Sequence, residues 1–201
     1  ITGASTGIGY ALAEELNKRG AEVILTARSE DKLHALAEKI KASGGKAHVF
    51  VEDLSIQGSA EALYNQIKSQ NLSIDILINN AGTVYTGYML DRSDEELENL
   101  INVNFTSMIY TIRAFMPAML EKNSGHIINI SSASSMTGAP KLAVYAATKW
   151  AVAGLTESLR LEVQKMGKSG VRFSSIHPNF LKKGLFEGTR LNFLGQLLAP
   201  G

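Results

Sequence analysis

The chain of 201 residues is 45% hydrophobic and 19% charged, with 18 glycines, no cysteine and a net charge of +1. This length and apolar share can bury a core, which excludes a disordered chain. The lack of cysteine excludes a disulfide scaffold, a thiolate metal site and a cysteine nucleophile. No apolar run approaches the roughly 18 residues that cross a bilayer, and the small net charge gives no reason to expect nucleic acid as a partner.

Short runs rich in Val and Ile alternate with longer segments of helical periodicity. The runs are too short for helices and nearly continuous in hydrophobicity, which is typical of parallel strands buried on both faces. The strands are expected at 23–26, 47–51, 75–78, 126–130 and 171–176.

Apolar residues at helical spacing mark the segments between the strands. A long helix is expected to begin near Ser93, an N-cap with Glu96 three residues on, and to end or kink near Pro117. Another helix is expected from Tyr145 to about Met166. The remaining helical stripes are Ile8, Leu12 and Leu16, ending at Gly20, then Leu33, Leu36, Ala37 and Ile40, ending at Gly44, and finally Leu63 and Ile67.

This alternation predicts a doubly wound parallel α/β sheet, the Rossmann fold, in a single domain over 1–201. Only Ile1 and Thr2 precede the first glycine, and 185–201 form an irregular tail. The domain is therefore expected to lack its first strand and its C-terminal elements.

A glycine loop opens the first helical stripe. Its spacing is Gly-x-x-x-Gly-x-Gly, in Gly3-Ala4-Ser5-Thr6-Gly7-Ile8-Gly9. Glycines permit a tight turn, close approach of the backbone to a pyrophosphate and close packing of the helix, while the helix N-terminus offers free N–H groups. The loop therefore predicts a dinucleotide site.

The end of the strand 23–26 predicts which dinucleotide binds. An acid here would contact the ribose hydroxyls of NAD, but the sequence reads Thr26-Ala27-Arg28-Ser29. Arg28 can pair with a 2′-phosphate and Ser29 can add a hydroxyl donor. NADP(H) is therefore favoured over NAD(H).

Tyr145 and Lys149 stand four residues apart, on one helix face. A nearby ammonium lowers the pKa of a phenol and makes it a usable acid or base. Ser132 follows the strand 126–130, at the sheet end where α/β proteins bind ligands.

Together these motifs resemble the short-chain dehydrogenase/reductase family, with Asn79-Asn80-Ala81-Gly82 and Asn104 as further matches. The resemblance implies that Tyr145 exchanges a proton with the substrate oxygen and that Ser132 orients that oxygen. It also implies that Lys149 binds the nicotinamide ribose and lowers the pKa of Tyr145. Asn104 would hold a water molecule that relays protons. The cofactor residues that it implies, with those predicted above, are Gly3, Ser5, Thr6, Gly7, Ile8, Gly9, Arg28, Ser29, Asp53, Leu54, Asn80, Ala81, Gly82, Tyr145, Lys149, Pro178 and Leu181.

The chain departs from the family pattern after the strand 171–176. Asn179 replaces a glycine, and Lys183 stands where a threonine would contact the nicotinamide carboxamide, which leaves that contact to the Leu181 backbone. His126 and His177 have no acid or second histidine at ligand spacing, so we expect structural or surface roles for them and no metal.

Apolar residues are expected to line the substrate side. They are Tyr85, Met136, Leu142, Val144, Phe180, Leu185 and Phe186, and they suggest a lipophilic ketone, aldehyde or alcohol. A substrate lid is expected over about 180–201, and Lys182 with Lys183 suggests either contact with a membrane surface or a solvated loop.

The leading hypothesis is an NADP(H)-dependent carbonyl reductase, with the resemblance suggesting a homodimer or homotetramer. Two alternatives remain open: a catalytically silent NADP(H)-binding sensor or scaffold with the same fold, and an unrelated Rossmann enzyme such as a methyltransferase. We expect a cytoplasmic location, with membrane association through residues preceding this stretch left open.

Overall fold

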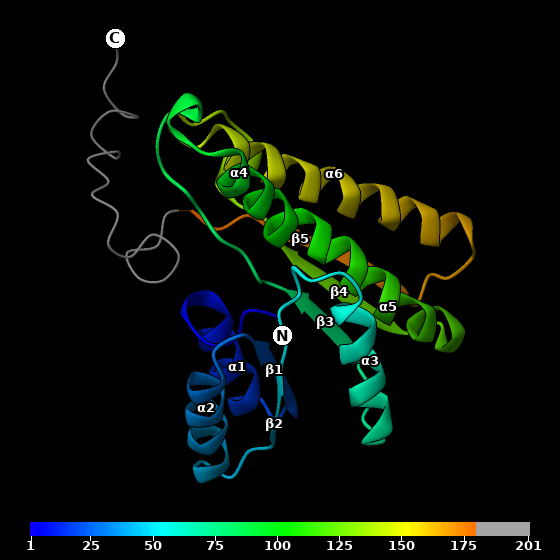
Figure 1. Cartoon of the computed structure of the whole chain (residues 1–201). Coiled ribbons are helices and arrows are strands. Elements are labelled where there is room, and N and C mark those ends of the chain that lie inside the picture. The colour runs from blue at the N-terminus through cyan, green and yellow to red at the C-terminus, as the bar shows by residue number, and fades with distance from the viewer. Residues whose placement is uncertain (180–201) are drawn as a thin grey trace.

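Five parallel strands alternate with helices in residues 1–179, which are the residues that the computed structural model describes (Figure 1). Every predicted strand is confirmed to within one residue at each end. The strands are β1 (Val23–Ala27), β2 (Ala47–Val51), β3 (Ile76–Asn79), β4 (Gly125–Ile130) and β5 (Val171–Ile176).

The chain start joins two groups of strands. β1 pairs with β2, and β4 pairs with both β3 and β5, all in parallel. Thr2 forms a parallel bridge with Thr26 and donates from its backbone N to the Ile78 carbonyl oxygen at 3.0 Å. Residues 1–2 thus take the place between β1 and β3 where the first strand was expected to be missing. The strand order reverses there, and open α/β sheets bind ligands at such a point.

The helices match the predicted stripes. They are α1 (Gly7–Lys18), α2 (Glu30–Ala42), α3 (Ser59–Ser69), α4 (Asp94–Ile101), α5 (Ser107–Lys122) and α6 (Ala143–Lys165), with 3₁₀ turns η1 (Met89–Asp91) and η3 (Ala133–Ser135) and a π-helical turn η2 (Asn102–Thr106). None of the helices within 1–179 is long and apolar enough to cross a membrane.

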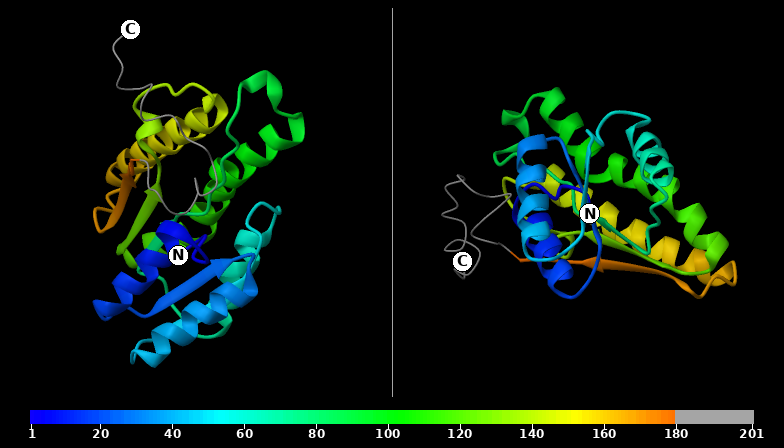
Figure 2. Two further views of the ribbon diagram at one scale, coloured as in Figure 1. Left: turned by 90° about the vertical axis from the view of Figure 1, so that its left-hand side faces the viewer. Right: turned by 90° about the horizontal axis from the view of Figure 1, so that it is seen from below.

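Two apolar cores lie on opposite faces of the strands. In β1, Leu25 packs with α1 and α2, whereas its neighbour Ile24 faces the larger core formed with α3, α5 and α6. This alternation follows from the two-residue period of a strand. Figure 2 shows α1 and α2 beside β1 and β2, separate from the long helices that run along β3 to β5.

The long helix expected from Ser93 differs from its prediction in two ways. η2 interrupts it between α4 and α5, and α5 continues past Pro117 to Lys122 instead of ending there. Phe115 and Met119, both buried in the larger core, flank the proline. Their packing holds the helix together although the proline lacks a backbone donor.

A buried row of polar side chains connects the two central strands to the helices over them. The Asn79 amide donates to Asn129 Oδ1 at 2.9 Å, and the Asn129 amide donates to Thr156 Oγ1 at 2.9 Å. Thr111 Oγ1 donates to Asn79 Oδ1 at 2.7 Å. The row fixes β3 against β4, because Asn79 and Asn129 stand on these two strands.

Candidate active site

The N-terminus of α1 is open toward a ligand. Thr6, its N-cap, makes no side-chain hydrogen bond to the helix, and no acid lies in the first turn. By contrast, Ser93 and Glu96 form a full capping box at the start of α4. The uncapped N–H groups and the positive end of the α1 dipole are therefore available to an anion.

The glycine loop needs its glycines for backbone conformation and for packing. Gly3 and Gly7 have φ angles of +63° and +57°, which L side chains rarely adopt. A Cβ on Gly9 would collide with the Gly3 carbonyl oxygen and with the amide of Asn80. Gly9 was expected to contact the cofactor, but it lies behind the loop and does not line the cleft described below.

Thr2 is an anchor that the sequence reasoning missed. Its buried hydroxyl accepts hydrogen bonds from the backbone N of Asn80 and of Ala81, both at 2.9 Å. The Asn80 amide in turn donates to the carbonyl oxygens of Thr2 and Gly3 at 2.9 and 3.1 Å. Asn80 therefore holds the glycine loop on β3. Thr2 directly precedes the glycine loop, and this position was the one signal in the sequence that pointed to it.

Arg28 follows β1 directly, and its guanidinium faces Asp53. Nη1 of Arg28 lies 3.8 Å from Oδ2 of Asp53, and the arginine side chain is 70% exposed. Burial raises the pKa of Asp53, but hydrogen bonds from Ser55 and the nearby Arg28 outweigh it and hold that pKa below its usual value. The carboxylate therefore stays ionised beside the arginine.

One cleft of about 300 Å³ brings most of the predicted residues together at the carboxyl ends of the strands. Of the predicted set, those on its wall are Gly3, Ser5, Thr6, Gly7, Ile8, Arg28, Ser29, Asp53, Leu54, Asn80, Ala81, Gly82, Ser132, Tyr145, Lys149 and Pro178. Leu181 lies outside the described residues. Sequence reasoning missed several wall residues that neighbour these motifs, namely Thr26, Ala27, Glu52, Ser55, Val103, Ser107, Ile130, Ser131, Ala133 and Asn179.

Ser132 and Tyr145 are hydrogen-bonded to each other through their side chains. Ser132 Oγ also accepts from the backbone N of Ser134 at 3.1 Å, where η3 begins. Burial raises the pKa of Tyr145 above its usual value of 10, and the bond with Ser132 opposes this only in part. The phenol is therefore protonated near neutral pH.

Lys149 lies next to the phenol and is itself buried. Its Nζ donates to the Ile130 carbonyl oxygen at 3.0 Å and lies 5.7 Å from the centroid of the Tyr145 ring. Burial lowers the pKa of Lys149 to about 8. The sequence predicted a lowered pKa for Tyr145, but the pKa is raised in this structure. The loss of hydration on burial outweighs the hydrogen bond with Ser132, which favours the phenolate.

Asn104 lies in the π-helical turn and is fully buried. Its Oδ1 accepts from the backbone N of Thr83 at 2.7 Å, and its Nδ2 donates to the Thr83 carbonyl oxygen at 2.9 Å. The side-chain amide thus fastens the loop after β3, behind the cleft wall. π-Helical turns often occur at functional sites, and the relay water at Asn104 stays a prediction.

An apolar cluster packs around Tyr145. Val144 and Tyr85 pack in one cluster with Leu142 and Tyr145, although Leu142 is only 2% exposed and offers little surface to a ligand. Met136, in contrast, is 68% exposed. The remaining expected wall residues, Phe180, Leu185 and Phe186, lie outside the described residues, as do Lys182, Lys183 and the expected lid.

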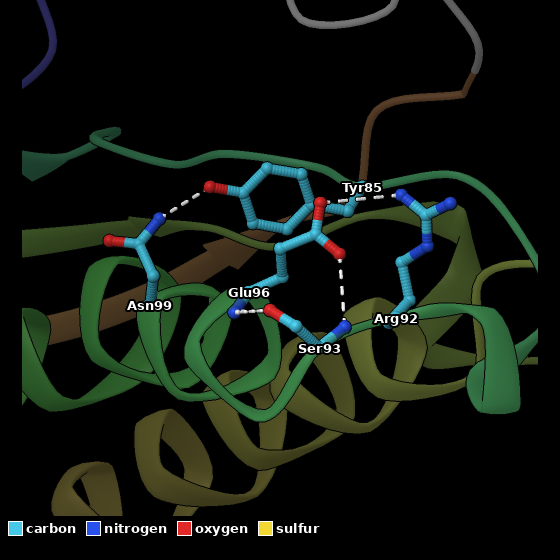
Figure 3. A network of polar contacts seen from close by, with 5 residues as sticks. All are labelled: Tyr85, Arg92, Ser93, Glu96 and Asn99. Atoms are coloured by element: carbon cyan, nitrogen blue, oxygen red, sulfur yellow. Dashed lines mark hydrogen bonds and ion pairs between the residues drawn. The ribbon is translucent and has the colours of Figure 1, made fainter.

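A polar network holds Tyr85 in place from α4 (Figure 3). The Tyr85 hydroxyl accepts from Asn99 Nδ2 at 2.7 Å. One turn earlier, the carboxylate of Glu96 accepts from the backbone N of Ser93 at 3.2 Å and pairs with Arg92 at 3.4 Å. Asn99 therefore ties Tyr85 to α4, and the capping box with Arg92 fixes the start of that helix.

His126 and His177 each form a hydrogen bond with a serine side chain. His126 Nε2 lies 2.9 Å from Ser174 Oγ, and His177 Nδ1 lies 2.7 Å from Ser135 Oγ. Within 1–179, no group of three or more His, Cys, Asp or Glu could hold a metal ion.

A parallel sheet with an uncapped glycine-loop helix and a Ser–Tyr–Lys cluster in the same cleft defines a dinucleotide-binding oxidoreductase. The sequence matches the short chain dehydrogenase family over residues 1–191. The chain belongs to the short-chain dehydrogenase/reductase family, whose enzymes act on alcohol and carbonyl groups.

Similar proteins include mouse estradiol 17-beta-dehydrogenase 11, 34% identical over the whole chain and 67% of the relative. Mouse epidermal retinol dehydrogenase 2 is 34% identical over 94% of the chain and 61% of the relative. The chain thus spans about two thirds of the length of these relatives.

Two solved structures illustrate the fold. A metagenomic short-chain oxidoreductase in complex with NADP has a TM-score of 0.84 and 37% identity, covering 90% of this chain and 81% of the other. A Burkholderia phymatum short-chain dehydrogenase/reductase in complex with NAD has a TM-score of 0.88 and 28% identity, covering 95% and 68%. Similar structures therefore bind either dinucleotide.

Proposed function

We propose that the protein is an NADP(H)-dependent oxidoreductase that interconverts a lipophilic ketone or aldehyde with its alcohol, with Tyr145 as acid and base. The observation that carries the proposal is the hydrogen bond between Tyr145 and Ser132 on the wall of the cleft that also contains the glycine loop. Residues 1–201 form one cofactor-binding and catalytic domain in this proposal.

The residues of the cleft fit a dinucleotide phosphate. The open N-terminus of α1 would hold the pyrophosphate, and Arg28 with Ser29 would hold a 2′-phosphate. Ser29 is the N-cap of α2 but makes no side-chain hydrogen bond to that helix, so its hydroxyl is available to a ligand. When bound, NADP(H) supplies or accepts the hydride.

Ser132, Tyr145 and Lys149 carry out the proton transfer in this proposal. Ser134 N–H occupies an acceptor site of Ser132 Oγ, which leaves the Ser132 hydroxyl hydrogen to donate toward a substrate oxygen or Tyr145. In the direction of reduction, the protonated phenol of Tyr145 gives its proton to that oxygen. Lys149, with its amine close to the ring, stabilises the phenolate that remains.

The apolar cluster around Tyr145 supports a lipophilic substrate. Val144 and Tyr85 are partly exposed beside the phenol, and Asn99 holds the Tyr85 hydroxyl. An apolar wall with few polar groups binds substrates by burial of their hydrocarbon surface. The names of the two mouse relatives, a steroid and a retinol dehydrogenase, support the same class of substrate.

The test is NADPH oxidation with a panel of lipophilic ketones and aldehydes. Tyr145→Phe should lower kcat by about 10²- to 10⁴-fold, the usual contribution of a general acid, while NADPH still binds. Tyr64→Phe is the matched control, because that ring packs edge-on against Phe115 in the core. Tight NADPH binding without ketone-dependent oxidation, unchanged in Tyr145→Phe, would instead support a silent sensor or scaffold.

We also propose self-association as a homodimer or homotetramer. Trp150 and Leu161 lie about three turns apart on one side of α6, and they are 53% and 51% exposed. Trp150→Glu should lower the mass measured by light scattering if this side is the interface.

A further inference from the structure

A row of hydrogen bonds connects His177 to the loop that carries Ser132. His177 follows β5, and its Nδ1 lies 2.7 Å from Ser135 Oγ. Ser135 Oγ lies 2.6 Å from the carbonyl oxygen of Ser132. On the other side of the ring, His177 Nε2 lies 2.8 Å from Ser175 Oγ. The imidazole thus bridges two serines from different segments.

The chemistry of the groups fixes the direction of each bond. A carbonyl oxygen can only accept, so Ser135 Oγ uses its one hydrogen on Ser132. His177 Nδ1 must then donate to Ser135, and Nε2 of the neutral ring accepts from Ser175. One tautomer, with the hydrogen on Nδ1, satisfies every group in the row.

The row completes a set of ties between the ends of β4 and β5. The backbone N of Ser131 donates to the Ile176 carbonyl oxygen at 2.8 Å, and that of Ala133 donates to Pro178 at 2.9 Å. These two bonds flank Ser132, whose own carbonyl is held by Ser135. Ser135 is buried, so no bulk water competes for this bond. The conformation of Ser132 therefore depends on the segment that contains His177.

We propose that His177 is a positioning residue for Ser132, acting through the hydroxyl of Ser135. The proposal rests on the proposed function, in which Ser132 orients the substrate oxygen. Without the imidazole, Ser135 loses its donor and its hydroxyl can turn away, which removes one of the two hydrogen bonds to the Ser132 carbonyl oxygen and leaves the bond from the backbone N of Ser135 at 2.9 Å. With that carbonyl held less firmly, the side chain of Ser132 can shift. A displacement of 1 Å at a reacting group can cost about 10²-fold in rate.

The experiment compares three substitutions of His177 in the purified protein. In His177→Asn the amide nitrogen can take the place of Nδ1 and donate to Ser135, whereas in His177→Gln it reaches toward the Nε2 side. His177→Ala and Ser135→Ala should each lower kcat for ketone reduction about 10-fold, with the Kd for NADPH within about twofold of wild type. His177→Asn should recover most of kcat, and His177→Gln should not.

The double variant His177→Ala/Ser135→Ala decides whether the two residues act as one unit. It should be no slower than either single variant, because each removes the same support. Multiplied losses in the double variant, equal losses in His177→Asn and His177→Gln, or a loss confined to NADPH binding would each overturn the proposal.

A measurement without turnover separates this proposal from the proposed function. Nitrogen-15 NMR of the imidazole should show the hydrogen on Nδ1, and Ser135→Ala should expose that hydrogen to exchange with water. A hydrogen found on Nε2 alone would overturn the proposal even if ketone reduction is confirmed. Absence of ketone reduction in the wild type would overturn the proposed function and, with it, a positioning role for His177 in that reaction.

Discussion

Arg28 and Asp53 approach each other from the ends of neighbouring strands, with Nη1 of the arginine 3.8 Å from Oδ2 of the aspartate. The contact is long for an ion pair and the guanidinium is mostly exposed, so the pair contributes little to folding. Its effect is to keep the arginine at the rim of the cleft. A phosphate at the end of β1 would take over the guanidinium in a shorter bidentate pair.

Arg28→Ala should therefore weaken NADPH binding selectively. Loss of hydrogen bonds to a charged group costs about 1.5–3 kcal/mol, which corresponds to a rise in Kd of about 10- to 100-fold. Binding of NADH should change little, because it has no 2′-phosphate. The measurement is a fluorescence titration of both dinucleotides.

Arg19→Ala is the matched control for Arg28→Ala. Arg19 is an exposed arginine at the end of α1 that pairs with Glu15 at 3.0 Å. Arg19→Ala also removes one positive charge, but at a place outside the cleft. The Kd values for NADPH and NADH should therefore stay near those of wild type. An unchanged NADPH to NADH preference in Arg28→Ala would show that the arginine does not read the phosphate.

Gly9→Ala should weaken NADPH binding, whereas Gly154→Ala should stabilise the fold. A methyl group on Gly9 meets the Gly3 backbone, which cannot yield without moving the glycine loop, so NADPH binding should fall at least 10-fold, or about 1.4 kcal/mol. At Gly154, inside α6, a methyl group meets no atom within 4 Å. Gly154 lies one turn from Trp150, on the side of α6 proposed for self-association, so the test is made in the Trp150→Glu background. There alanine should raise the free energy of unfolding by about 0.5–1 kcal/mol, through helix propensity.

Urea unfolding and NADPH titration of the two glycine variants check this pair of predictions. If Gly9→Ala binds NADPH as well as wild type does, the loop is not held by the contact between Gly9 and Gly3. If Gly154→Ala is destabilised, its surroundings are not open in the folded protein.

The buried row of polar groups between β3 and β4 predicts a large stability effect at Asn129. Asn129→Ala removes the acceptor of the Asn79 amide and the donor to Thr156 at once. An unsatisfied buried polar group costs about 1–3 kcal/mol, so the free energy of unfolding should fall by at least that amount. Ser69→Ala, which loses one exposed hydroxyl on α3, should stay within about 0.5 kcal/mol of wild type.

Urea unfolding also checks the Asn129 prediction. Equal stability of Asn129→Ala and Ser69→Ala would mean that water replaces the lost amide. In either case NADPH binding should be retained by the folded fraction, because Asn129 does not line the cleft.

The strands and most of the cleft were predictable because their signals are local. A run such as 126–130 has a single buried-strand pattern, and a glycine loop placed before a helix carries its own geometry. The π-helical turn at Asn104 was not predictable, because its apolar periodicity continues that of α4 and α5. Nor does any local pattern show that the Gly9 surface faces Gly3 and not the cleft.

The pKa values of Tyr145 and Lys149 depend on how deeply the two side chains are buried, and their spacing in the sequence does not reveal this. Tyr145 and Lys149 stand at the expected helical spacing, and this predicted an ammonium that lowers the pKa of the phenol. Both groups are buried, so the pKa of the phenol is raised and that of the amine is lowered. The contacts of the Thr2 hydroxyl with Asn80 and of the His177 imidazole with Ser135 were not predictable either, since these partners lie far away along the chain.

The buried amine of Lys149 makes the stability of the protein depend on pH. The pKa of Lys149 is lowered from 10.5 to about 8 in the folded protein. Below about pH 8 the amine is protonated in both the folded and the unfolded state, and folding bears the full cost of burying the charge. Above it the folded amine loses its proton while the unfolded one keeps it up to pH 10.5, so this cost is relieved as the pH rises.

Lys149→Met keeps the apolar stem and removes the titrating group. The free energy of unfolding of wild type should rise relative to this variant by about 2–3 kcal/mol between roughly pH 7 and pH 10, since one pKa unit corresponds to about 1.4 kcal/mol. All other titrating groups are common to both proteins, so the difference between two series of urea unfolding curves isolates Lys149. Parallel pH profiles for the two proteins would show that the amine is hydrated in the folded state and not buried beside Tyr145.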